Sequence, residues 1–426
     1  MDRYRRLPMF ARIILAAVVG AVFGLFLEQD AVFGLHPDSF KWASDLVLQA
    51  LRLLATPLIF LSLLHSILKA DIRGRTAGKL MWILMSNTTL AILIGLIVAD
   101  TLQPGLHVKF PPPSTPIDKK PFDLLADLMG RFPKDFLNPF ANNDVIGIIV
   151  LGIAIALALR SLRNTNHEGK IKDLFGYVEL GLAVTMKMLH WLFELVPLAV
   201  LAVVARVVGT NGIGPLVNMF WFVGSVLLAL LLMFGVYMMR LRLSSWVRPG
   251  VFLRKAVDAF ALAFSTASSA ATLPVTYECA VEKIGVQEES ASIGIMVGGT
   301  FNHDGTALYE AMAALFVAQS ISHHLTLEHQ IVIVFMSIVA SVGAAGIPEA
   351  GLVTMLAVFN AVHLPVEYVP LLLPLDWFLD RCRTTVNVAG DLASTCILEG
   401  RTRPIPRIKE FKGEFENIEE KVGTRD

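Results

Sequence analysis

The sequence predicts an all-α polytopic membrane protein, and its composition together with its recurring apolar stretches carries that prediction. Of 426 residues, 55% are hydrophobic and only 17% are charged, against about 25% charged residues in soluble domains. Mean hydropathy is +0.62. Near-uncharged stretches recur that are long enough to cross about 30 Å of hydrocarbon. The 36 basic and 36 acidic residues cancel, so no strongly basic composition points to nucleic acid.

Six helices are expected to cross the membrane in the first part of the chain, near residues 11–33, 43–69, 77–101, 141–160, 177–207 and 214–239. Basic residues precede the first span and follow the second, fourth and sixth, whereas the intervening loops are acidic, mixed or nearly uncharged. Lys and Arg concentrate in cytoplasmic loops. This alternation predicts cytoplasmic termini, and the short soluble segments favour a prokaryotic inner membrane. The Pro-rich stretch 103–139 is expected to be an external connection.

Two apolar segments of the second half are interrupted by small and helix-breaking residues. Segment 260–279 is interrupted at residues 265–274, and segment 331–359 at residues 341–348. Irregular backbone at membrane depth is tolerated where it is buried or lines a cavity, and paired interrupted segments mark transporter binding sites. Both segments are therefore expected to be re-entrant hairpins, with two ordinary kinked helices as the alternative.

The last apolar segment carries a stripe of charged and polar residues. At about 100° per residue, one helical face holds five of them, namely Asp376, Asp380, Arg383, Asn387 and Asp391. Arg381 points away from this face, so a supporting or gating role is expected for it. Ionisable groups inside a span are costly and mark functional sites. A purely structural ion network is the alternative.

A second polar cluster occupies residues 300–306, TFNHDGT, in the preceding apolar segment. Its glycine can let the helix unwind, and carbonyl and carboxylate oxygens suit a hard cation such as Na⁺. Glu310 lies about 120° around the helix from Asp304, so it is expected to face a different neighbour, where its carboxyl group could carry a proton. His303 is either protonatable or a neutral packing residue bonded to a carbonyl, and His65 is expected to be structural.

The chain resembles the glutamate transporter family, the dicarboxylate/amino acid:cation symporters that include archaeal aspartate transporters and animal excitatory amino acid transporters. The similarity covers nearly the whole chain and is strongest in SSAATLP (268–274), NHDGTALYE (302–310), GAAGIP (343–348) and DRCRTTVN (380–387). It implies eight transmembrane helices, two re-entrant hairpins, inverted repeats, a homotrimer and an elevator mechanism.

The same resemblance implies a division of the chain into parts. Residues 1–76 would form the first two scaffold helices, and 77–140 a transport-domain helix with the external loop. Residues 141–240 would add two scaffold helices and a transport-domain helix. Residues 241–400 would form the transport-domain core, and 401–426 the cytoplasmic tail.

The resemblance also implies a substrate site. Arg383 would hold a side-chain carboxylate, as its planar fork favours, and Asp380 would bind the α-ammonium group. Having both residues favours an acidic amino acid. Asp376 would orient Arg383. The remaining substrate-binding residues would be Asn387, Thr384, Thr306, Ser268, Ser269 and Gly346.

The cation sites depart from the family pattern. Asn302, Asp304, Asp391 and Thr88 could still hold Na⁺, but the sequence differs from the family at three positions, with His303 in place of Met, Leu84 in place of Tyr and Asn87 in place of Thr. Glu310 occupies the proton-carrying position of animal members, and His303 is a second candidate for a proton. The coupling ion is therefore expected to be H⁺, Na⁺ or both, with no other cofactor.

These observations favour a secondary active symporter for L-aspartate or L-glutamate, embedded in lipid as a homotrimer without a nucleic-acid partner. The alternatives are a dicarboxylate or neutral amino acid transporter of the same fold, and an anion-conducting channel. A membrane enzyme is disfavoured because the sequence offers no convincing nucleophile–base pair or metal triad.

Overall fold

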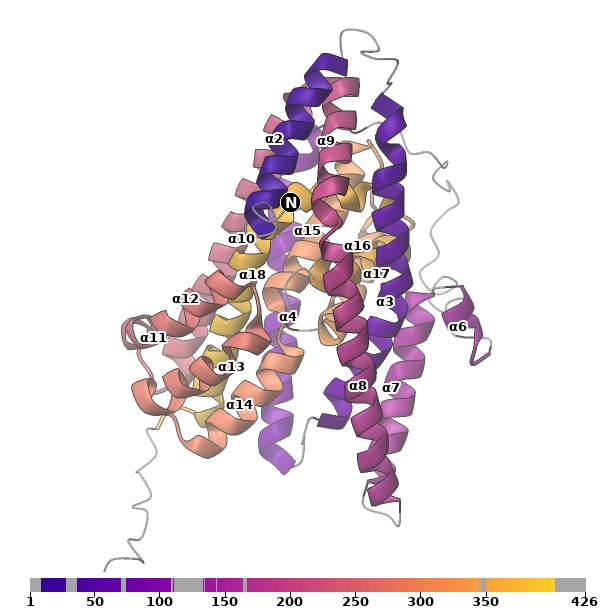
Figure 1. Ribbon diagram of the computed structural model, residues 1–426. Coiled ribbons are helices and arrows are strands. Elements are labelled where there is room, and N and C mark those ends of the chain that lie inside the picture. The colour runs from indigo at the N-terminus through magenta and orange to yellow at the C-terminus, as the bar shows by residue number, and fades with distance from the viewer. Residues whose placement is uncertain are drawn as a thin grey trace, which may run out of the picture.

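The computed structural model describes residues 9–27, 37–69, 74–108, 110, 133, 135–142, 144–163, 167–344, 346 and 350–402. All regular secondary structure in these ranges is helical (Figure 1), which confirms the predicted all-α class. The predicted tail beyond residue 402, residues 28–33 of the first span, and most of the expected external loop lie outside the described ranges.

The longer helices follow the predicted segments closely. In chain order the elements are α2 (Met9–Leu27), η2 (Pro37–Phe40), α3 (Lys41–Lys69), α4 (Gly74–Leu102), η3 (Pro104–His107), α6 (Asn138–Ala141), α7 (Val145–Leu162), α8 (Glu168–Phe193), α9 (Val196–Asn211), α10 (Gly214–Ser244), α11 (Pro249–Lys255), α12 (Val257–Thr266), α13 (Ser269–Glu278), η4 (Cys279–Ile284), α14 (Glu288–Phe301), α15 (Asp304–Ser320), α16 (Leu327–Gly343), α17 (Ala350–Ala361), η5 (Val366–Tyr368) and α18 (Val369–Glu399).

Within the described ranges, three helices are long and apolar enough to cross a membrane by themselves: α3, α10 and the part of α4 from Gly78 to Leu102. The span predicted over residues 177–207 is not one straight helix, because α8 and α9 meet there at a bend of 44°. Pro197 lies in the first turn of α9. Its ring nitrogen has no proton to donate, so the chain begins a new helix there rather than continuing α8.

Both predicted interruptions are present. Helix α12 ends at Thr266, and Ala267 then adopts the left-handed conformation with φ 52°. Ser268 caps α13 by accepting a hydrogen bond from the Ala271 amide at 3.2 Å, as a Ser at this position is suited to do. In the second segment, α16 ends at Gly343 and α17 begins at Ala350.

One group of helices consists of α2, α3, α7, α8 and α9, in which α2 packs along α9 and α3 packs against α7, α8 and α9 (Figure 1). A Cβ atom at Gly20 would lie 2.6 Å from the Leu201 carbonyl oxygen, and one at Gly24 2.7 Å from the Ala205 carbonyl oxygen. Glycines four residues apart thus let two helix backbones approach closely. Arg12 of α2 also pairs with Glu194, which follows α8, at 2.6 Å.

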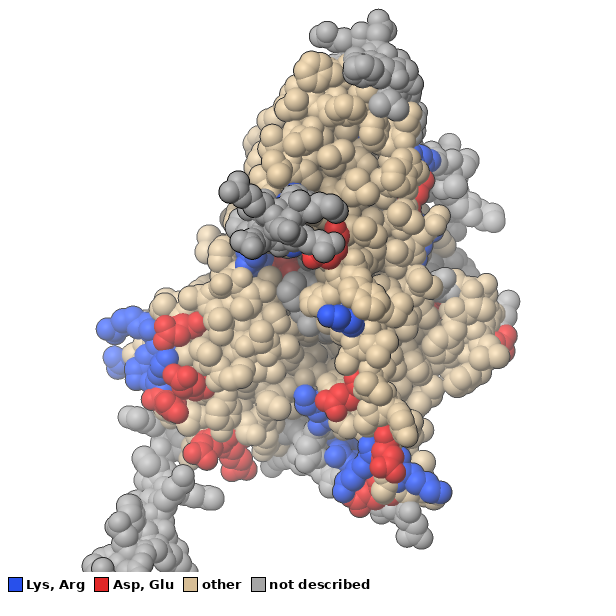
Figure 2. Space-filling model, viewed as in Figure 1, with Lys and Arg blue, Asp and Glu red and all other residues tan. Residues whose placement is uncertain are grey.

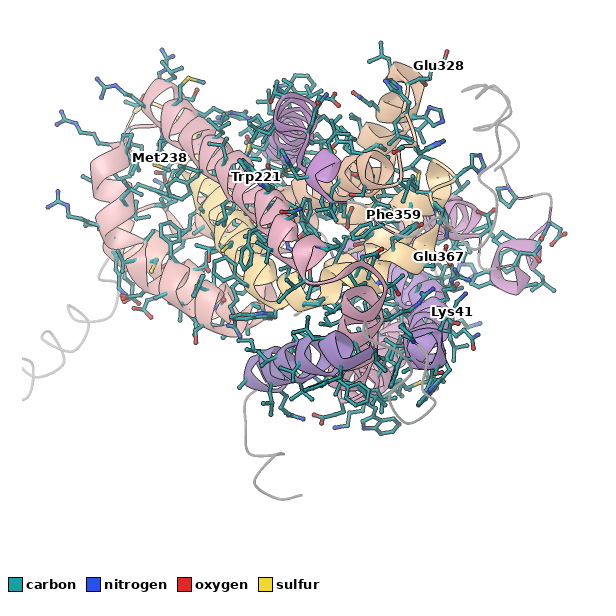
Figure 3. All side chains as sticks on the ribbon, turned by 90° about the horizontal axis from the view of Figure 1, so that it is seen from above. Lys41, Trp221, Met238, Glu328, Phe359 and Glu367 are labelled. Carbon is teal, nitrogen blue, oxygen red and sulfur yellow. The ribbon has the colours of Figure 1, made fainter. Side chains whose placement is uncertain are left out.

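A second group surrounds α15 and α18 and includes α4, α10, α12, α13, α14, α16 and α17. Every residue of α15 except Gln319 is buried. Viewed from above (Figure 3), Phe359 of α17 is enclosed among the helices, whereas Glu328 of α16 lies at the periphery. The two groups meet where α18 lies against α9 and where α3 lies against α16 and α17. The polar stripe of α18 is therefore deep in the molecule.

The outer surface is mostly apolar. Large side chains such as Trp82, Phe220 and Leu231 are 74%, 67% and 68% exposed. In the view of Figure 2, most Lys, Arg, Asp and Glu gather in the lower half, over α11 and the lower ends of α7 and α8, and the upper half is nearly free of them. A surface of this kind fits a lipid environment.

Candidate functional site

Helix α18 buries the predicted polar stripe. Asp376, Asp380, Arg383, Asn387 and Asp391 are all 5% exposed or less, so the helical spacing identifies the inward face correctly.

Arg381 points elsewhere, as the same spacing predicts. Its guanidinium donates hydrogen bonds to the carbonyl oxygens of Phe264, at 2.8 Å, and Ser265. These two residues belong to the last turn of α12, whose carbonyls lack helical partners. Arg381 therefore fastens α18 to the first interrupted segment.

Arg383 is the centre of a buried charge cluster. Its Nη2 atom lies 2.9 Å from Asp376 Oδ1 and 2.8 Å from Asp380 Oδ1, and its Cζ atom lies 4.0 Å from the centre of the Tyr309 ring. Its Nε and Nη1 atoms have no hydrogen-bond partner among the described residues. Buried donors are nearly always paired, so these two atoms are expected to pair with a hydrogen-bond acceptor of a bound ligand.

The Nη1 atom of Arg383 lies close to the first turn of α17 and to Thr306 of α15. A Cβ atom at Gly351 would lie 3.2 Å from Arg383 Nη1 and 3.1 Å from Thr306 Cγ2. Glycine at this position therefore keeps the backbone of α17 close to the guanidinium. A carboxylate is a group that pairs strongly with the N–H donors of an arginine.

Asn387 connects this cluster to the break between α14 and α15. Its Oδ1 accepts a hydrogen bond from the Gly305 amide at 2.8 Å, and its Nδ2 lies 3.3 Å from Thr306 Oγ1. The Asn302 side chain donates to the Asn387 carbonyl at 3.1 Å and to Asp391 Oδ1 at 3.0 Å. Asn302 Oδ1 is buried without a hydrogen-bond partner in the described structure. This orphaned oxygen, next to a carboxylate, fits a hard cation.

Asp304, on the other side of the break, accepts a hydrogen bond at each carboxylate oxygen. Thr88 of α4 donates to its Oδ1 at 2.6 Å, and Tyr237 of α10 donates to its Oδ2 at 2.5 Å. Thr88 also lies 3.1 Å from the carbonyl oxygen of Leu84, whose side chain is fully buried. Each Asp304 carboxylate oxygen therefore accepts one hydrogen bond from the protein, whereas Asn302 Oδ1 accepts none from the described residues.

Glu310 has different neighbours from Asp304, as its position on the helix predicts. The Thr354 hydroxyl of α17 donates a hydrogen bond to Glu310 Oε1. Glu310 Oε2 is buried and without a hydrogen-bond partner among the described residues. Arg383 is the positive charge that acts on this carboxyl group.

The His303 side chain is only 3% exposed, and neither ring nitrogen has a hydrogen-bond partner in the described ranges. The backbone of Ser341 is its polar neighbour. His65 stacks on the Phe175 ring, with ring centres 5.4 Å apart, in keeping with a structural role.

The tips of the two interrupted segments touch each other. Ser268 Oγ donates to the Gly346 carbonyl at 2.8 Å, and the Ala270 amide donates to the same oxygen at 3.0 Å. A Cβ atom at Gly346 would collide with Ser269 Oγ. Thr384 and Ser269 are both buried. The contact between the tips joins α12–α13 to α16–α17 next to the α18 stripe.

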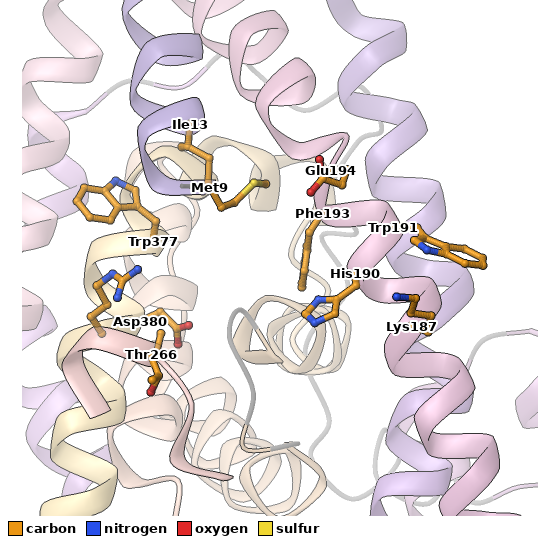
Figure 4. Close-up of a pocket in the computed structure, with 12 residues that line it drawn as sticks. Met9, Ile13, Lys187, His190, Trp191, Phe193, Glu194, Thr266, Trp377 and Asp380 are labelled. Carbon is orange, nitrogen blue, oxygen red and sulfur yellow. The ribbon is translucent and has the colours of Figure 1, made fainter. Parts of the chain in front are cut away.

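A cavity of about 480 Å³ opens between the two groups of helices and reaches Asp380. Figure 4 shows Asp380, Thr266 and Trp377 on one wall, and Lys187, His190 and Phe193 of α8 on the other. The Arg383 cluster therefore has a polar approach through its Asp380 side.

Four residues of the site were not singled out by the sequence: Tyr309, Tyr237, Arg240 and Thr354. Thr354 lies in an apolar stretch that looks like ordinary core, and Tyr309 lies within the motif NHDGTALYE but was given no role of its own. Tyr237 and Arg240 carry a recognisable signal, since they are three residues apart near the end of an apolar helix and so share one of its faces. Their partners, however, come from other helices and are visible only in the fold.

Comparison with known proteins places the chain among transporters. A family model described as the sodium:dicarboxylate symporter family matches residues 9–400. A C4-dicarboxylate transport protein of Stenotrophomonas maltophilia is 29% identical, over 93% of this chain and 88% of its own length. A C4-dicarboxylate transport protein of Xanthomonas oryzae pv. oryzae is 30% identical, with the same coverage. The putative sodium-dependent excitatory amino acid transporter glt-4 of Caenorhabditis elegans is 29% identical, over 91% and 88%.

Proposed function

Because this chain belongs to the sodium:dicarboxylate symporter family, we propose that it is a secondary active symporter that carries L-aspartate or L-glutamate across the cell inner membrane. The family consists of membrane transporters of dicarboxylates and amino acids. The observation that carries the choice of substrate is the incomplete guanidinium of Arg383, with two free donor atoms, next to a carboxylate at Asp380.

Each charge of the substrate has a counterpart in this arrangement. The side-chain carboxylate pairs with the guanidinium of Arg383 through its unpartnered N–H groups. The α-ammonium group takes Asp380, which lines the cavity. The α-carboxylate lies near Asn387 and the backbone around Ser269, with Thr306, Thr384, Ser268 and Gly346 closing the pocket. Asp376 holds Arg383 in place from the opposite side.

Two cation routes accompany the substrate. Na⁺ is held by the Asn302 and Asp391 side, where Asn302 Oδ1 is buried and has no hydrogen-bond partner among the described residues. A proton is carried by Glu310, whose Oε2 atom is likewise unpartnered in the described structure. One sodium ion, one proton or both then move with the substrate.

The fold supports alternating access by the relative movement of two parts. The scaffold is formed by α2, α3, α7, α8 and α9, and it assembles as a homotrimer. The mobile part is formed by α4 and α10–α18. Eight spans follow from counting α8–α9 and α14–α15 as one span each, and α12–α13 and α16–α17 are the two re-entrant hairpins. The contact between Ser268 and Gly346 then closes the substrate pocket.

A C4-dicarboxylate is the second candidate substrate, because two of the similar proteins carry that name. The Arg383 site would accept one carboxylate of either substrate. The two candidates differ at Asp380, which attracts an ammonium group and repels a second carboxylate. The presence of Asp380 therefore favours an amino acid.

Uptake into proteoliposomes tests this proposal. Labelled aspartate, glutamate and succinate are supplied separately under an imposed proton gradient, an imposed sodium gradient, or neither. Gradient-driven uptake of aspartate or glutamate is expected, with little succinate uptake. In Asp380→Asn, amino acid uptake should fall and succinate uptake should rise. Succinate uptake by the wild type in preference to both amino acids would overturn the choice of substrate, and binding without gradient-driven uptake would overturn symport.

A further inference from the structure

Asp304, with its donors Thr88 and Tyr237, forms a cluster that also contains a cation, Arg240 of α10. We call these four residues the Asp304 cluster. The Arg240 guanidinium donates a hydrogen bond to Asn87 Oδ1, and its charge acts on the Asp304 carboxylate. Asn87 is fully buried, and its amide group donates to Ser394 Oγ of α18 at 3.1 Å. Arg240 thus extends inward from the end of α10 and joins α4, α10 and α18 around Asp304.

The oxygen atoms that a sodium ion would use here each accept one hydrogen bond from the protein. The two Asp304 oxygens accept hydrogen bonds from Thr88 and Tyr237, and Asn87 Oδ1 accepts one from Arg240. Leu84 adds only an apolar side chain. A sodium ion needs several oxygen ligands, much as Ca²⁺ does, and here it would compete with these three hydrogen bonds and with the positive charge of Arg240.

A buried carboxylate nevertheless needs a compensating positive charge. Removing one partner of a buried ion pair is strongly destabilising because the other charge remains without compensation. Arg240 supplies this charge permanently, since a guanidinium stays protonated in proteins. Arg240 is half-buried and therefore retains some hydration, which lowers the cost of placing a charge there.

We infer that Arg240 is a fixed internal cation that replaces a sodium ion at Asp304, so that this side of the α14–α15 break binds no Na⁺. Any sodium coupling then depends on the Asn302 and Asp391 side alone. The inference deepens the proposed symport. It rests on that proposal only where it concerns which sodium site could drive transport. The residue contacts and the binding test do not require transport.

Thermal unfolding of the purified full-length protein tests the inference. The unfolding temperature is measured in sodium chloride and in an equal concentration of choline chloride, and the difference is the sodium shift. Asp304→Asn is expected to keep the wild-type sodium shift, because Asp304 does not bind the ion. Arg240→Met is expected to gain an additional sodium shift on the order of 2 °C, and Asp304→Asn in that background should remove it.

Arg242→Met is the matched control, because Arg242 lies two residues after Arg240 on α10 and is exposed. It should show the wild-type sodium shift. Loss of the wild-type shift in Asp304→Asn would overturn the inference, as would an Arg240→Met protein with no additional shift. If Arg240→Met does not fold, the double variant Arg240→Met/Asp304→Asn is expected to fold, since both charges are then removed. Failure of both variants to fold would also overturn the inference.

These readouts separate the inference from the proposed function. A protein that binds no Na⁺ at Asp304 but fails to accumulate substrate contradicts symport and leaves the role of Arg240 intact. If the wild type accumulates aspartate but Asp304→Asn loses the sodium shift, symport is supported and the inference about Arg240 is contradicted.

Discussion

Two buried charge clusters lie within the same group of helices, and they differ in how completely their hydrogen bonds are made. Around Arg383, one guanidinium faces two carboxylates, and its Nε and Nη1 atoms have no protein partner in the described structure. Around Asp304, both carboxylate oxygens accept hydrogen bonds, and Arg240 supplies the opposite charge.

This difference distinguishes the Arg383 cluster, which we expect to bind a ligand, from the Asp304 cluster, which we expect to stabilise the fold. An unsatisfied buried polar atom costs about 1–3 kcal/mol, so a protein keeps one only where something else will pair with it. The Arg383 cluster and Glu310 contain such atoms, whereas Asp304 contains none. The first two should control transport, and the Asp304 cluster should control stability.

The largest effect is expected at Arg383. Arg383→Lys keeps the charge but loses the planar fork, and a carboxylate then finds one donor group where it had two. Initial aspartate uptake should fall by about 100-fold, the scale of about 3 kcal/mol. Arg381→Lys is the control, since its guanidinium donates to backbone carbonyls of α12, and uptake should fall far less. Equal losses in the two variants would contradict the special role of Arg383.

Glu310 comes second, because it is the other incomplete group. Glu310→Gln preserves an acceptor for the Thr354 hydroxyl but removes the site of protonation. Uptake driven by a proton gradient should be lost, with exchange of internal for external aspartate retained. Glu328→Gln changes an exposed carboxylate on α16 and should leave the response to the gradient intact. Proton-driven uptake that persists in Glu310→Gln would assign the proton to another group.

Much of this arrangement could be predicted from the sequence, and the remainder depended on contacts between helices. The α18 stripe follows from helical spacing, and the breaks at Ala267 and after Gly343 follow from small and helix-breaking residues. The bend between α8 and α9 was missed although Pro197 lies at it, because the apolar run continues through the proline without interruption. Hydropathy alone does not report a change of direction.

The pairing of Asp304 with Tyr237 and Arg240 could not be predicted in the same way. These residues are 67 and 64 positions away from Asp304 and lie on a different helix. Periodicity assigns a face to each helix but not the partner of that face. The family resemblance pointed to a weakened sodium site, and only the fold explains what compensates the carboxylate.

A smaller effect is expected where the two interrupted segments close over the Arg383 cluster. Gly346→Ala places a Cβ against Ser269 Oγ, with the Ala270 amide 3.2 Å away. The contact between the tips then needs a shift of one segment, and apparent aspartate affinity should fall about tenfold, or about 1.4 kcal/mol. Gly235→Ala is the matched control, because a Cβ there meets nothing within 4 Å. Similar affinities in the two variants would show that this contact does not help to close the pocket.

The smallest effect on transport, and a clear effect on stability, is expected at the Asp304 cluster. Tyr237→Phe removes the hydroxyl that donates to Asp304 Oδ2 and leaves this oxygen unsatisfied, at a cost of about 1–3 kcal/mol of unfolding free energy. Thr88→Val does the same at Oδ1. Aspartate affinity should change little, because neither hydroxyl is a substrate ligand. Thermal unfolding and aspartate binding are measured on the same preparation. A loss of binding free energy larger than the loss of unfolding free energy would contradict this prediction. It would place Asp304 with Arg383 in the ligand site, because only a cluster coupled to the ligand responds more strongly in binding than in folding.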